Sequence, residues 1–172
     1  RQVARIRKKR ELEPILRLPI DGIMFSDDWG YQKGVILGPD RWRRVIKPCY
    51  RRLYDRVHAA GKFTLNHCCG SIADILPDLI EIGLDVYESV QPEANNNNPY
   101  ELKRRFGREI TFFGGLGAQS MPHYTPEGVR AEIHRLRAEM GAGGGYILAP
   151  AKPIPAGTPV EVAAAVVETF IE

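Results

Sequence analysis

Short apolar segments alternate along the chain with longer amphipathic segments. The short segments are rich in Val, Ile, Phe and Tyr and have the length of strands, whereas the longer ones repeat their apolar residues with the spacing of a helix. The pattern predicts strands over residues 23–28, 63–69, 86–92, 110–116 and 146–151. It predicts helices over residues 2–17, 39–60, 71–82, 99–106, 126–140 and 159–170. Strands that alternate with helices indicate an α/β fold with a parallel sheet.

The number of strands limits the architecture. A closed (β/α)8 barrel of the TIM type has eight strands and about 250 residues, whereas this chain has 172 residues. We therefore expect one domain, residues 1–172, that forms the C-terminal part of such a barrel (about five βα units), with the N-terminal units missing. The chain starts at Arg1 inside a helical pattern, which also suggests a partial sequence. The alternative is an open doubly wound sheet, although no G-x-G-x-x-G motif follows the first strand.

Composition and charge exclude several classes of protein. Hydrophobic residues make up 44% of the chain and charged residues 26%, which is typical of a soluble globular protein and not of a disordered one. No apolar run approaches the roughly 20 residues that a membrane span needs. Lys and Arg outnumber Asp and Glu by only 24 to 21, an excess too small to indicate nucleic-acid binding. We expect a small-molecule substrate, with neither membrane nor nucleic acid as a partner.

The cysteines indicate a reducing environment. There are three, Cys49, Cys68 and Cys69, and an odd number with two adjacent members does not suit a disulfide framework. The basic N-terminus lacks the apolar run of a secretory signal. Both observations favour a cytoplasmic location.

The second predicted strand carries the sharpest chemical pattern. Reactive side chains of parallel α/β folds lie where strands end, and this strand ends in His67, Cys68 and Cys69. The two-residue period of a strand places His67 and Cys69 on one face. An imidazole and a thiolate can bind one Zn²⁺ at roughly 2.0 and 2.3 Å, but zinc needs a further ligand, for which Asp28 and Glu88 are candidates. The alternative is a hydrogen-bonded histidine beside two packed cysteines.

Other strand ends offer further candidates. Of Asp27 and Asp28, we expect one to face the site for proton transfer, metal ligation or substrate contact. Gly114 and Gly115 would let the backbone approach a cofactor closely, or would form a tight turn. Lys152 lies among prolines and could hold an anionic group or be simply exposed. We therefore predict catalytic roles for Asp28, Glu88 and Lys152, metal binding by His67 and Cys69, and cofactor binding by Gly114 and Gly115.

Five segments together resemble the uroporphyrinogen decarboxylase superfamily. They are DGIMFSDDWG, KFTLNHCCGSI, ILPDLIEIGLDVYESVQPEA, TFFGGLGAQ and GGYILAPAKPIPAGTPVE, and they cover about residues 21–172. The resemblance implies a (β/α)8 barrel. It also implies one of two chemistries, which are cofactor-free decarboxylation of uroporphyrinogen in haem biosynthesis and zinc-dependent methyl transfer between a corrinoid and a thiol.

The residues present favour the methyltransferase branch of that superfamily. Its members bind zinc through a His-x-Cys pair and a later cysteine, and His67 and Cys69 match the pair. The later cysteine should fall within residues 149–153, where this chain has Lys152 instead. The resemblance thus implies zinc-assisted methyl transfer, with Zn²⁺ as cofactor, a corrinoid as co-substrate and a corrinoid protein as partner.

Two other functions stay open. The first is decarboxylation of uroporphyrinogen or a related acid, in which a barrel carboxylate would bind pyrrole N–H groups; the N-L-G-H-G-like end of the last strand in that branch is absent here. The second is a non-catalytic fragment or assembly unit. A five-stranded part of a barrel exposes two edges that need covering, for instance by a second copy in a homodimer.

Overall fold

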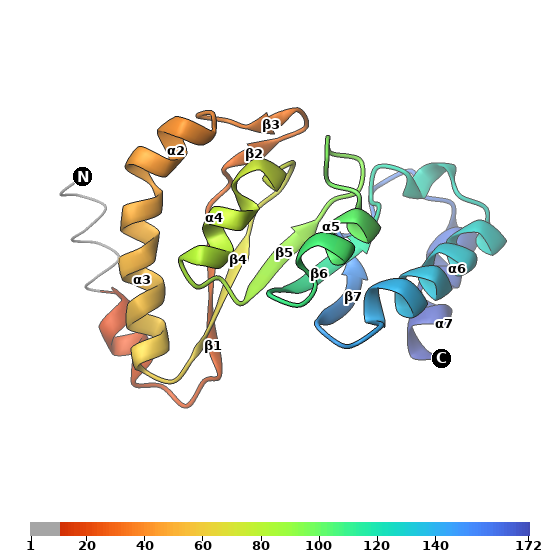
Figure 1. Ribbon diagram of the computed structural model, residues 1–172. Helices are drawn as coiled ribbons and strands as arrows, with labels where there is room; N and C mark the ends of the chain where they lie inside the picture. Colours follow the sequence, from red (N-terminus) through yellow and green to blue (C-terminus); the bar gives the residue numbers. More distant parts are fainter. Residues whose placement is uncertain (1–10) are drawn as a thin grey trace.

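The computed structural model describes residues 11–172, which form a five-stranded parallel sheet (Figure 1). Along the sheet the strands follow chain order. They are β1 (Gly22–Ser26), β4 (Phe63–His67), β5 (Val86–Val90), β6 (Thr111–Leu116) and β7 (Tyr146–Pro150). All five predicted strands are confirmed, and four of them end one or two residues earlier than predicted.

The strand order decides between the two predicted architectures. Each new strand is added to the same edge of the sheet, and within residues 11–172 the order never reverses. A doubly wound sheet needs such a reversal, so that alternative is wrong. The α/β fold of successive βα units, corresponding to part of a barrel, is confirmed.

Helices connect the strands and cover one face of the sheet, with α4 and α5 in front of it in Figure 1. No helix in residues 11–172 has both the length and the apolar character required to cross a membrane. The α-helices are α2 (Pro39–Val45), α3 (Lys47–Ala59), α4 (Leu76–Glu81), α5 (Pro99–Phe106), α6 (Pro126–Arg135) and α7 (Val160–Ile171). Short helical turns are η1 (Ala73–Ile75), η2 (Met121–His123) and η3 (Leu136–Met140), of which η3 extends α6.

The structure corrects the bounds of three predicted helices. The helix predicted over 39–60 is interrupted at Ile46, because Pro48 lacks an N–H and its ring clashes with the carbonyl of Arg44 in a continuous helix. The helix predicted from Ser71 starts later, at η1, because the Ser71 amide donates a hydrogen bond to the Tyr31 carbonyl (2.9 Å). Of the helix predicted over 2–17, residues 11–16 are helical and residues 2–10 lie outside the described part of the chain.

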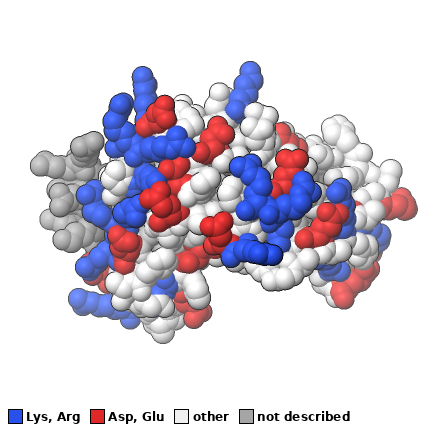
Figure 2. Space-filling view, viewed as in Figure 1, with Lys and Arg blue, Asp and Glu red and all other residues white. Residues whose placement is uncertain are grey.

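Ion pairs join the helices on the covered side of the sheet. Asp78 of α4 bonds both Arg43 of α2 (2.9 Å) and Lys47 of α3 (2.7 Å). Glu81 also accepts from Lys47 (2.5 Å). Figure 2 shows basic and acidic side chains interspersed over this region. The basic residues of α2 and α3 are thus partly balanced by α4.

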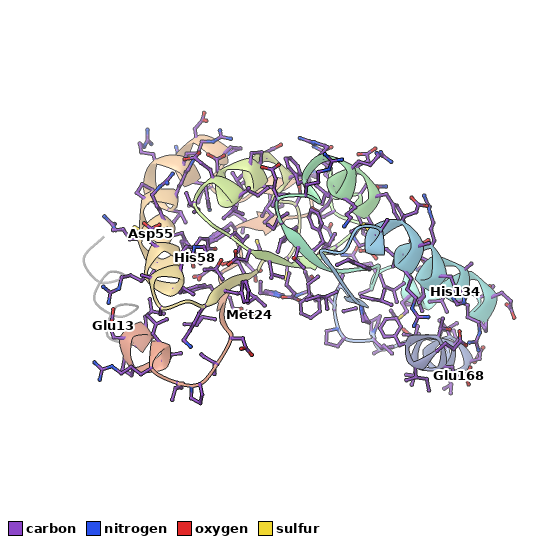
Figure 3. All side chains as sticks on the ribbon, turned by 60° about the horizontal axis from the view of Figure 1, so that its bottom comes forward. Glu13, Met24, Asp55, His58, His134 and Glu168 are labelled. Atoms are coloured by element: carbon purple, nitrogen blue, oxygen red, sulfur yellow. The ribbon has the colours of Figure 1, made fainter. Side chains whose placement is uncertain are left out.

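The two faces of the sheet differ in their environment. Thr64 and Asn66 of β4 are fully buried toward the helices, where the Tyr54 hydroxyl donates a hydrogen bond to Asn66 Oδ1 (3.3 Å). The alternate positions carry large apolar side chains that remain exposed. Met24 (labelled in Figure 3) is 49% exposed, Phe63 61% and Ile147 42%. In a closed barrel, positions of this parity fill the interior.

A small hairpin, which the sequence pattern did not predict, follows β1 directly. It pairs β2 (Gly30–Tyr31) with β3 (Gly34–Val35). Its Gln32 carbonyl accepts a hydrogen bond from the Asn95 amide (2.8 Å), and Tyr31 forms a bridge to Ser71. The hairpin therefore ties the segment after β1 to the segments after β4 and β5.

The buried face of the sheet is stabilised mainly by apolar packing. Leu79 of α4 is completely buried in the core between the helices and the sheet. We expect Leu79→Ala to lower the free energy of unfolding by about 2–5 kcal/mol, because the substitution leaves a cavity in close-packed surroundings. Chemical denaturation followed by circular dichroism measures the change.

Leu18→Ala is the matched control for that substitution. Leu18 is 52% exposed, so removal of the same atoms leaves no enclosed cavity. We expect a change below about 1 kcal/mol. Equal losses in the two variants would contradict the packing described here.

Candidate metal centre

The register of the parallel sheet brings three strand ends side by side. Ser26 of β1 pairs with His67 of β4, and His67 pairs with Glu88 of β5. Asp28 lies two residues beyond the end of β1, and Cys69 two residues beyond the end of β4. Side chains that are far apart in the sequence therefore meet at the carboxyl end of the sheet.

His67 is the centre of this cluster, and each of its ring nitrogens lies near a different neighbour. Its Nδ1 bonds the Glu88 carboxylate, and its Nε2 lies 3.0 Å from Cys69 Sγ and 3.8 Å from Asp28 Oδ1. The side chains of His67 and Glu88 are largely buried, with 21% and 17% exposed. A carboxylate on one imidazole nitrogen fixes the tautomer and orientation of the ring and leaves the other nitrogen free to bind a metal.

Asp28, His67 and Cys69 together offer a set of donor atoms for a metal ion. One ligand atom from each lies within 4.8 Å of the others. Ligands of a tetrahedral zinc at its usual bond lengths lie roughly 3.5 Å apart, so the nitrogen–sulfur and nitrogen–oxygen separations are compatible with zinc. Imidazole, thiolate and carboxylate are all zinc ligands. The donor set fits the ion.

The two adjacent aspartates point to different sides, as predicted. The Tyr50 hydroxyl donates a hydrogen bond to the Asp27 carboxylate on the helix side of the sheet. Asp28 Oδ1 instead accepts a hydrogen bond from the Cys69 amide (2.8 Å). Burial acts to raise the pKa of Asp28, but that amide, with His67 and Lys152, leaves the pKa below its usual value. Asp28 is therefore a carboxylate at neutral pH.

The two adjacent cysteines also differ. Cys68 is completely buried, and its Sγ accepts a hydrogen bond from the Trp29 amide (3.1 Å). Burial raises the pKa of Cys68 to about 12, so this side chain stays a thiol. Cys69 is only partly buried, and its burial also raises its pKa, while Lys152 acts in the opposite direction. Of the two, Cys69 is the one that faces the cluster.

Lys152 lies beside Cys69, just after β7. Its ammonium group donates a hydrogen bond to Cys69 Sγ. The resemblance to the methyltransferases placed a third zinc ligand in this region, and an ammonium group cannot coordinate a cation. Asp28, and not residue 152, completes the donor set with His67 and Cys69.

A cavity of about 360 Å³ opens next to the cluster. Its lining is mostly apolar. His67, Glu88 and Lys152 supply polar groups, and Phe113, Pro150 and Pro153 are among its apolar residues. Such a combination is typical of a small-molecule site.

Gly114 and Gly115 are explained by packing within the protein. Both have positive φ angles, 120° and 95°. A Cβ on Gly114 would lie 2.9 Å from the Val90 nitrogen, and one on Gly115 would lie 3.2 Å from the Tyr146 hydroxyl oxygen. These contacts account for the glycines without a ligand, and their cofactor-binding role stays a prediction.

Two buried polar residues that support the site were not singled out from the sequence. The Ser89 hydroxyl donates a hydrogen bond to the Ala151 carbonyl (2.6 Å), next to Lys152. Asn97 Nδ2 donates to the Gln91 carbonyl (2.9 Å), and the Gln91 side chain accepts from the Gly70 amide (3.2 Å). The signal in the sequence was the presence of polar residues within and after an otherwise apolar strand.

Comparison with known proteins identifies the family. The family model described as uroporphyrinogen decarboxylase (URO-D) matches residues 20–172. The chain belongs to the uroporphyrinogen decarboxylase family. The predicted membership in this superfamily is thereby confirmed, whereas no curated protein matches the chain.

A solved structure shares the fold. It is a methyltransferase from Methanosarcina mazei, with a TM-score of 0.64 and 21% sequence identity. The match covers 90% of this chain and 43% of the methyltransferase chain. This member of the uroporphyrinogen decarboxylase family thus spans less than half the length of that structure.

The surroundings of Cys69 generate a prediction about its titration. In metal-free protein we expect iodoacetamide to alkylate Cys69 with a pH midpoint above that of a small thiol, because burial raises its pKa. Lys152→Met should shift the midpoint further up, because the ammonium group stabilises the thiolate. Asp28→Asn should shift it down by removing a negative charge. Mass spectrometry of alkylation rates against pH measures all three.

A Cys49→Ser background simplifies that experiment. Cys49 is the other partly exposed thiol, whereas Cys68 is buried. A lower midpoint in Lys152→Met than in the parent protein would contradict the geometry around Cys69.

Proposed function

We propose that the protein is a zinc-dependent methyltransferase that transfers a methyl group between a corrinoid and a thiol or similar acceptor. The convergence of Asp28, His67 and Cys69 donor atoms within 4.8 Å carries the proposal. The fold shared with a methyltransferase supports it. Because the chain spans less than half of that neighbour, the activity of the whole protein and a corrinoid-protein partner belong to the proposal.

Each residue of the cluster has a distinct role in this proposal. His67 would bind the metal through Nε2, while Glu88 on Nδ1 orients the ring and increases its basicity. Cys69 would bind as a thiolate and Asp28 as a carboxylate, and the hydrogen bond between the Cys69 amide and Asp28 fixes the two strand ends relative to each other. When bound, zinc would supply a Lewis acid that keeps a substrate thiol in its reactive anionic form.

Binding of zinc must displace the proton of Cys69. Since burial raises the pKa of this thiol, the metal has to compete with the proton at neutral pH, and affinity should increase with pH. Lys152 next to Sγ favours the thiolate and so assists this exchange. The free cysteines also agree with a reducing, cytoplasmic location.

The direct test is the zinc content of the purified protein. We expect about one Zn²⁺ per chain in the parent protein and little in Cys69→Ser, because the hydroxyl of serine is a far weaker zinc ligand than a thiolate. Inductively coupled plasma mass spectrometry after equilibration with zinc measures the metal. Cys49→Ser, which changes a thiol on α3, should retain the zinc of the parent. Equal and negligible zinc in the parent and Cys69→Ser would end the proposal.

Glu88 offers a second test through its contact with His67. We expect Glu88→Gln to weaken zinc binding by about 10–100-fold, because the amide orients the imidazole less strongly than the carboxylate does. Competition with a chromophoric chelator measures the affinity. Glu109→Gln, a change on the exposed surface, is the matched control and should bind zinc normally. Unchanged affinity in Glu88→Gln would refute the orienting role.

A second candidate function is decarboxylation of uroporphyrinogen or a related acid. The match to the uroporphyrinogen decarboxylase model over residues 20–172 favours it. In this case Asp28, a carboxylate at the edge of the site, would hydrogen-bond pyrrole N–H groups and stabilise the charge formed on protonation of the ring. Incubation with uroporphyrinogen distinguishes the candidates, because absence of decarboxylated product removes this one.

A further inference from the structure

The cavity beside the candidate metal centre has an uneven distribution of polar groups. Its volume, about 360 Å³, lies near the lower end of the range for ligand pockets, roughly 300–1,000 Å³. Phe113, Pro150 and Pro153 give it apolar walls, and Lys152 brings a cation to it. A small ligand with a largely apolar surface matches this space.

The negative groups of the site have hydrogen-bond partners, and the ammonium of Lys152 has more donors than its one partner uses. Glu88 accepts from His67, and Asp28 accepts from the Cys69 amide. An ammonium group has three N–H donors. Among residues 11–172, Lys152 Nζ has Cys69 Sγ as its hydrogen-bond partner, which leaves two donors available. The Lys152 side chain is exposed, so these two donors are accessible to a ligand, and an ammonium group with unused donors favours an anionic partner.

The backbone holds Lys152 in place independently of its side chain. The preceding residue, Ala151, is anchored on two strands, because its amide donates to the Leu116 carbonyl (2.8 Å) and its carbonyl accepts from Ser89 Oγ (2.6 Å). Pro150 and Pro153 on either side restrict the chain further. The lysine is therefore presented to the cavity from a preorganised segment, which reduces the entropy cost of ligand binding.

We propose that Lys152 determines substrate specificity by pairing with the anionic group of a small substrate whose apolar body contacts Phe113 and the prolines. The proposal rests on the proposed function, because the cavity adjoins the candidate zinc ligands. It adds the class of substrate, which is a small, mostly apolar acid. Neutral molecules of the same shape bind less well, because they cannot accept a charge-assisted hydrogen bond from the ammonium group.

Benzoate and benzamide test the proposal because they share a shape and differ in charge. We expect the protein to bind benzoate at least about tenfold more tightly than benzamide, the ratio expected from a charge-assisted hydrogen bond. Lys152→Met keeps most of the side-chain volume and should bind both with similar affinity. Lys152→Arg should restore the preference for benzoate. Titrations followed by ligand-observed NMR measure the affinities in zinc-loaded and zinc-free protein.

The controls separate this inference from the zinc proposal. Lys33→Met, a change on the exposed hairpin, should leave the preference for benzoate intact. Equal binding of the two probes by the parent protein would overturn the inference, as would a preference that survives in Lys152→Met, since the metal or another group would then hold the carboxylate. Zinc content of the same samples is read separately. If the protein binds zinc but does not prefer benzoate, only the inference about Lys152 is refuted. If it prefers benzoate but does not bind zinc, only the metal proposal is refuted.

Discussion

The parallel register of β1, β4 and β5 is the constraint on which the site depends. It sets Ser26, His67 and Glu88 in one row, so that the imidazole and the carboxylate are neighbours without any help from loops. The remaining members, Asp28 and Cys69, lie two residues beyond their strands and are tied to each other by a backbone hydrogen bond. The positions of these groups follow from strand pairing, which is the most rigid part of the fold.

Hydrogen bonds outside the row of Ser26, His67 and Glu88 fix the turn that follows Cys69. The Tyr31–Ser71 bridge and the Gln91–Gly70 hydrogen bond hold the turn after Cys69 from two directions. Gly70 has a φ of 71°, and a Cβ there would lie 2.7 Å from the Tyr31 backbone, so only glycine fits. The close approach of the hairpin thus explains the glycine that follows the His-Cys-Cys sequence.

The strands, and the side of the sheet to which each candidate side chain points, could be predicted from the sequence, because both depend on the local alternation of residues along a strand. His67 and Cys69 share a side as a two-residue period requires, and Asp27 and Asp28 diverge for the same reason. Contacts between residues far apart in the chain could not be predicted from the sequence. Nothing local indicates that the Ser89 hydroxyl reaches the Ala151 carbonyl, or that the hairpin after β1 packs on the turn after β4. The predicted start of the helix at Ser71 was wrong, because the Ser71 amide bonds the Tyr31 carbonyl of the hairpin, and helix propensity does not include this competing long-range contact.

The anchoring of Ala151 has a consequence for the residue that follows it. Both hydrogen bonds that fix this residue come from its main chain, so the side chain that follows is free to vary without disturbing the sheet. The side chain at position 152 can therefore be replaced while both hydrogen bonds of Ala151 are kept, so that the chemical character of this strand end is set separately from the backbone that carries it.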